Sequence, residues 1–62
     1  MCQSDAYLLK DGEKELIMED VSRIKPYQGG VILTGIFGEE KQIKAKIKEI
    51  LLTDHEIILE NN

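Results

Sequence analysis

Turn-forming residues divide this chain into short apolar segments, and their spacing restricts the fold more than any other feature. The segments Asp11-Gly12 and Gln28-Gly29-Gly30 each lie between two apolar segments, which is typical of tight turns between paired strands. The apolar residues include nine isoleucines and two valines, whose β-branched side chains favour strands over helices. The expected strands are 6–9, 15–18, 21–25, 31–34, 41–46, 47–53 and 56–60.

The segment from Glu39 to Leu52 permits two interpretations. Ile43, Ile47 and Ile50 recur at helical spacing, whereas residues 42–48 alternate strictly between polar and apolar side chains. A period of two is what a strand needs when one face lies on a core and the other in water. We therefore predict two strands here, with a helix as the alternative.

Two further features suggest how the strands are arranged. Pro26 cannot donate to a strand ladder, so the third strand is expected to stop there. Gly35 and Gly38 enclose two apolar residues, which predicts a bend or bulge where the sheet turns a corner. A sheet of this size protects its edges best by curling into a barrel. We predict an all-β fold, a small SH3-like antiparallel barrel of about six or seven strands in hairpin order, as a single domain over residues 1–62.

The length and the cysteine content limit how such a domain can be stabilised. A domain of about 60 residues buries only about 60% of the surface that its unfolded chain exposes. Cys2 is the one cysteine among 62 residues, so neither an internal disulfide nor an all-cysteine zinc site can stabilise the domain. We therefore expect dimerisation or a bound metal to contribute stability.

The charge disfavours nucleic acid as the main partner. The formal net charge is −4, whereas binding to phosphates needs a surplus of lysine and arginine. One basic run stands against this background, over Lys41–Lys48, but it contains no aromatic residue on which a base could stack. A solvated strand face that discourages edge pairing explains these lysines better. RNA binding through the Lys41–Lys48 face remains the alternative.

Other classes of protein lack support in the sequence. No apolar run approaches the roughly 20 residues that span a bilayer. The start of the chain lacks the basic-then-apolar layout of a signal peptide, so we expect a cytoplasmic protein with a reduced thiol and no membrane partner. The sequence offers no catalytic arrangement of paired carboxylates, of Ser, His and Asp, or of Cys and His. We therefore predict that the protein is not an enzyme.

Cys2 stands out because it lies beside the terminal amine. If Met1 is removed, the amine and thiolate of Cys2 close one five-membered chelate ring. If Met1 stays, its amine, the Cys2 amide nitrogen and the thiolate form two fused rings. Planar nitrogen and sulfur donors suit Ni(II) or Cu(II), although Cys2 could also be an ordinary terminal thiol. His55, the one histidine, could be a further ligand or a proton carrier, or an exposed turn residue.

Short motifs along nearly the whole chain carry a family resemblance. They are Met1-Cys2, Lys10-Asp11-Gly12, residues 16–21, residues 31–34, Phe37-Gly38-Glu39, residues 47–50 and residues 55–59. In this order they resemble the CooT family. The resemblance implies a small cytoplasmic β protein associated with nickel delivery to carbon monoxide dehydrogenase. It also implies a homodimer that holds one Ni(II) at its interface through Cys2 of each chain.

A second family shares the Met-Cys start. The Met1-Cys2 start is similar to that of HypC, the hydrogenase maturation chaperone. This chain is shorter, however, and lacks the Ala-Ile-Pro run that follows the cysteine in HypC. We therefore predict a Ni(II)-binding metallochaperone whose metal ligand is Cys2 and whose partners are a second copy and carbon monoxide dehydrogenase or its maturation proteins. Copper as the metal, a HypC-like interaction chaperone and an RNA-binding module stay open as alternatives.

Overall fold

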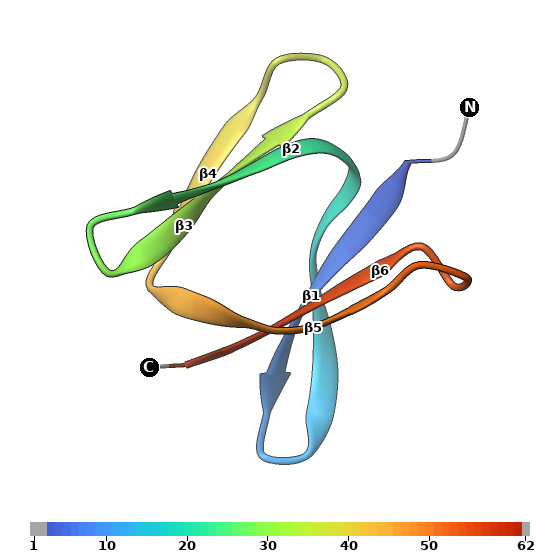
Figure 1. The fold of residues 1–62 in the computed structure, drawn as a ribbon, viewed down its shortest axis with the longest axis vertical. Coiled ribbons are helices and arrows are strands. Elements are labelled where there is room, and N and C mark those ends of the chain that lie inside the picture. Colours follow the sequence, from blue (N-terminus) through green and yellow to red (C-terminus); the bar gives the residue numbers. More distant parts are fainter. Residues whose placement is uncertain (1–2, 62) are drawn as a thin grey trace.

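A six-stranded sheet, curled on itself, is formed by residues 3–61, the part of the chain that the computed structural model describes (Figure 1). The strands are β1 (Ser4–Lys10), β2 (Glu13–Tyr27), β3 (Gly30–Gly35), β4 (Glu40–Ile43), β5 (Ala45–Leu51) and β6 (Glu56–Asn61). Their order in the sheet is β4-β3-β2-β1-β6-β5. The prediction of a small all-β barrel fold is confirmed, and the strand interpretation of residues 39–52 holds over the helical one.

The curl follows from how the chain joins the two outer strands. β4 and β5 lie at opposite ends of the strand order, yet Lys44 alone separates them in sequence. The two edges of the sheet must therefore approach each other at this corner. Gly30, at the start of β3, lies so close to the corner that a Cβ atom there would collide with the Ile43 carbonyl oxygen. Only glycine allows the two main chains to approach this closely.

Two tight turns lie where the sequence placed them. Asp11 and Gly12 have φ angles of 53° and 80°, and Gln28 and Gly29 have φ angles of 45° and 78°. Positive φ at both central residues is the mark of the type I′ turns that match the twist of paired strands. These turns join β1 to β2 and β2 to β3.

The strand pairing differs from the predicted meander at one place. β1 pairs with β2 antiparallel, but it also pairs with β6 in parallel, from Asp5 opposite Glu56 to Leu9 opposite Glu60. The other ladders are antiparallel. The parallel ladder arises because β5 carries the chain past the corner to the far side of β1. Hairpin spacing describes neighbours in sequence and does not encode this long-range pair.

The two strands predicted at 15–18 and 21–25 are one bent strand, β2. Asp20 has a φ of 54°, and the register of β2 against both neighbours shifts close to it. A residue in the left-handed region bends the strand without ending it. The expectation that the strand stops at Pro26 is wrong, because Pro26 pairs with Val31 in β3. The ladder to β1 ends at Val21, so proline sits where β2 is an edge.

The break between the next two strands also lies elsewhere than predicted. The sequence placed it between Lys46 and Ile47, whereas the structure breaks the pairing at Lys44. Ala45 is buried directly after the break, and Ile47 is 40% exposed. The predicted bend at Gly35 and Gly38 is present as the turn between β3 and β4.

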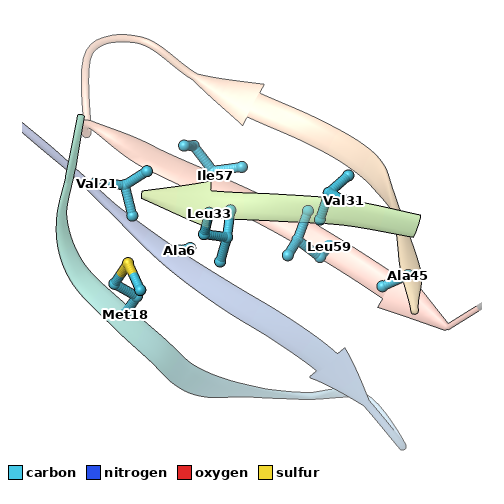
Figure 2. Close-up of a cluster of buried hydrophobic side chains, with 8 residues drawn as sticks. All are labelled: Ala6, Met18, Val21, Val31, Leu33, Ala45, Ile57 and Leu59. Carbon is cyan, nitrogen blue, oxygen red and sulfur yellow. The ribbon is translucent and has the colours of Figure 1, made fainter. Parts of the chain in front are cut away.

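The core lies inside the curl, as Figure 2 shows. Its buried side chains come from every strand except β4 and are Ala6, Met18, Val21, Val31, Leu33, Ala45, Ile57 and Leu59. Leu33 and Leu59 are fully buried, and Ile43 of β4 packs against the cluster from its edge. So small a core leaves several large apolar side chains on the surface.

Candidate functional site

The first described residues lie between two turns. Ser4 pairs with Val21, which in turn pairs with Gly35 at the end of β3. On its other side, the Asp5 amide donates a hydrogen bond to the His55 carbonyl oxygen at 2.9 Å. Figure 1 shows the start of β1 between the β3–β4 turn and the β5–β6 turn. We call these two turns, together with residues 3–5, the N-terminal end of the barrel.

The β3–β4 turn holds an aromatic side chain away from the protein. The Gly35 amide donates to the Glu39 carbonyl oxygen at 2.8 Å, and the Ile36 amide donates to the Asp20 carbonyl oxygen at 3.1 Å. The Phe37 amide donates to Glu39 Oε1 at 3.2 Å. These bonds fix the main chain of the turn while the Phe37 side chain stays 87% exposed.

The β5–β6 turn presents a second apolar side chain. Leu52 is 79% exposed, and its carbonyl oxygen accepts a hydrogen bond of 3.4 Å from the His55 amide. His55 adopts a φ of 57°, which lets the chain reverse into β6. His55 is exposed. Because its carbonyl oxygen accepts the hydrogen bond from the Asp5 amide, the histidine lies at the same end of the barrel as the start of β1.

Several carboxylates lie on these two turns and on the strand residues next to them. They are Asp5, Glu19, Asp20, Glu39, Glu40 and Asp54. Asp5 Oδ1 accepts a hydrogen bond of 3.2 Å from the Asp20 amide, which ties β1 to the bend in β2. The N-terminal end therefore combines two exposed apolar side chains with a group of acidic residues.

The residues that the structure describes do not form a metal site by themselves. Between Gln3 and Asn61, no three His, Cys, Asp or Glu side chains are arranged to hold a metal ion. The predicted ligand, Cys2, lies outside the described residues. Ser4, two positions later, begins β1 at the N-terminal end.

The lysines of the Lys41–Lys48 run do not act as one surface. Lys41 Nζ donates to the Ile17 carbonyl oxygen at 3.3 Å. Lys46 Nζ and Lys48 Nζ lie 3.6 and 3.9 Å from the Glu60 carboxylate. These contacts spread the charges over two outer strands and neutralise part of them, which weakens the RNA-binding alternative.

Phe37 and Leu52 are the residues that sequence reasoning missed. The glycines on either side of Ile36-Phe37 predicted a bend, but they did not say that Phe37 points outward. Leu52 was assigned to a strand, whereas it lies in the turn after β5. An aromatic residue inside a glycine-bounded turn is the signal that could have identified Phe37, because turns lie on the surface.

Together, these features define a small all-β barrel with an exposed apolar and acidic end. Within residues 3–61 no helix is long and apolar enough to cross a membrane. The CooT family model, described as CO dehydrogenase accessory protein CooT, matches residues 1–60. The chain therefore belongs to the CooT family of CO dehydrogenase accessory proteins, as its motifs predicted. An accessory role agrees with the expectation that the protein is not an enzyme.

Two relatives resemble this chain along nearly its whole length. A crystal structure assigned to CooT from Carboxydothermus hydrogenoformans superimposes with a TM-score of 0.91 at 41% identity and covers 98% of both chains. An uncharacterised protein of Methanocaldococcus jannaschii is 33% identical over 60 residues, which are 97% of this chain and 98% of the relative. The similarity therefore extends over the complete sheet.

Proposed function

We propose that this protein carries Ni(II) as cargo for CO dehydrogenase in the cytoplasm, as a homodimer. In this proposal the Cys2 thiolates of two copies and N-terminal nitrogens of each copy hold one ion. One observation carries it: the end of the barrel where β1 begins also presents Phe37 and Leu52, which are 87% and 79% exposed. The chain thus enters β1, two positions after the predicted ligand, at the end that carries these exposed apolar side chains.

A two-fold axis near the N-termini accounts for both features. Such an axis brings the same surface of two copies together, so each Phe37 and Leu52 would be covered by the partner. It would also bring two thiolates together, which one chain cannot supply. The need for ligands from two chains agrees with the lack of a three-ligand cluster within residues 3–61 of one copy.

The donor set fits nickel but does not exclude copper. Two thiolates and two nitrogens in a plane suit Ni(II) or Cu(II), and such sites generally bind Cu(II) more tightly. Loading with nickel would then depend on which metal is available. Such a site also suits transfer of the ion, because its ligands would come from the chain termini rather than from the core.

The test is native mass spectrometry of the reduced protein, with and without one Ni(II) per two chains, beside Cys2→Ser. We expect a dimer that carries one nickel, and no nickel on the variant. Nickel retained by Cys2→Ser would contradict the proposal. A protein that stays metal-free at every nickel concentration, yet binds CO dehydrogenase, would instead indicate a HypC-like interaction chaperone.

A further inference from the structure

A groove of about 410 Å³ lies at the other end of β3 and β5 from the N-terminal end. It runs between the β2–β3 turn and the first residues of β5. Its lining includes the buried side chains of Val31 and Ala45 and the partly exposed side chains of Tyr27 and Ile47. The groove therefore offers apolar surface that the barrel does not cover.

The charged residues that line this groove, or directly precede a lining residue in sequence, are lysines. Lys46 lines it, and Lys25 and Lys44 each directly precede a lining residue in sequence. Lys46 shares the Glu60 carboxylate with Lys48. Over the described part of the chain, Lys25 and Lys44 form no ion pair. We call this feature the basic groove, in contrast to the acidic N-terminal end.

The main chain next to the basic groove suits an extended ligand. β5 is an edge strand, and within residues 3–61 its one hydrogen-bonded strand neighbour is β6. A peptide in extended conformation can add to such an edge, with specificity set by the pockets and charges beside it. Opposite charges on adjacent strands stabilise the pairing, so a carboxylate would be favoured opposite Lys46.

We propose that the basic groove binds an extended acidic segment of a partner protein, with one apolar side chain of that segment between Tyr27 and Ile47. Charge complementarity carries this choice of partner. Nucleic acid fits less well, because Tyr27 is the one aromatic residue in the lining and single strands bind by stacking successive bases on aromatic side chains. A second copy inserting its acidic end would form an open head-to-tail chain rather than a closed dimer.

The test uses a phage-displayed library of random peptides against the reduced, nickel-free full-length chain. We expect enriched peptides that combine glutamate or aspartate with a large apolar residue. Their affinity is then measured by fluorescence anisotropy with Ile47→Thr and with Ile50→Thr. Both are partly exposed isoleucines on β5, but only Ile47 lines the groove. Ile47→Thr should weaken binding about five- to tenfold, and Ile50→Thr should leave it unchanged.

Charge reversal provides a second readout. Lys44→Glu combined with Lys46→Glu should abolish binding of the acidic peptide, and added salt should weaken binding to the unmodified protein. The proposal is overturned if no peptide is enriched, if the enriched peptides lack acidic residues, or if both isoleucine variants bind equally. It is also overturned if polyuridylic acid displaces the peptide with higher affinity, or if Ile47→Thr abolishes self-association. None of these results depends on nickel binding, so this proposal and the nickel proposal can fail separately.

Discussion

Replacement of Phe37 by serine tests whether the N-terminal end is where two copies meet. Phe37 is 87% exposed in the single chain, so its side chain contributes little to the folding of one copy. The hydrogen bonds of the turn come from main-chain atoms and from Glu39, and serine leaves them in place. The substitution should therefore weaken association without unfolding the barrel.

The expected magnitude follows from the exposed surface. Complete burial of a phenylalanine side chain contributes about 3 kcal/mol at most. In a two-fold dimer the side chain occurs twice, and if each is half buried the loss is about 3 kcal/mol for the dimer. Since about 1.4 kcal/mol corresponds to a tenfold change, the dissociation constant should rise roughly a hundredfold. The stability of the separated monomer should change by less than about 0.5 kcal/mol.

Sedimentation equilibrium of the nickel-free protein measures this constant directly. Ile47→Thr is the matched control, because Ile47 is a large exposed apolar residue at the opposite end of β5. We expect the control to keep the dimer. An unchanged dissociation constant for Phe37→Ser, or an equal effect of both variants, would refute this interface. If Phe37→Ser instead lost binding to CO dehydrogenase while staying dimeric, the Phe37 side chain would belong to the client interface.

Four further substitutions test the fold itself. Gly30→Ala places a Cβ atom against the main chain of the β4–β5 corner, and it should lower the free energy of unfolding in urea by about 1–3 kcal/mol. The Cβ atom of Gly35→Ala meets only the movable side chain of a glutamate, so this variant should lose less. Leu33→Ala removes a fully buried side chain, and a loss of about 2–5 kcal/mol should leave the variant largely unfolded by circular dichroism. The Lys14–Glu56 hydrogen bond of 2.9 Å raises the pKa of Lys14 above 10.5. The stabilisation that this hydrogen bond provides is therefore complete below pH 10.5 and is lost as the pH rises through the higher folded-state pKa. Lys14→Gln should slightly reduce the free energy of unfolding at neutral pH and remove its dependence on alkaline pH.

Local sequence predicted the type of each element better than how the elements join. The turns at Asp11-Gly12 and Gln28-Gly29 were found because positive φ at two consecutive positions needs particular residues. The break at Lys44 was missed, because a one-residue corner closes no turn and needs no special side chain. The interruption predicted between residues 18 and 21 is only a bend, because aspartate at position 20 tolerates the left-handed region without ending the strand.

Pairings and exposures depend on the whole sheet and could not be predicted from spacing. The parallel ladder between β1 and β6 joins segments about fifty positions apart, and no local pattern specifies it. The chemistry of Cys2 was inferred from its place beside the terminal amine in the sequence, whereas the exposed Phe37 and Leu52 come from two distant turns. Those turns flank β1 only because β2 and β6 pair with it.

The division of charge between the two ends of the barrel connects the two proposals. An acidic N-terminal end repels another copy of itself, so apolar contact at Phe37 and Leu52 has to exceed this repulsion before a dimer can form. Added salt screens exposed charges and should therefore strengthen the dimer, whereas it should weaken an acidic peptide in the basic groove. Opposite responses to ionic strength follow directly from where the carboxylates and the lysines lie. If both associations changed in the same direction, the charges would not govern them, and the assignment of a separate partner to each end would fail.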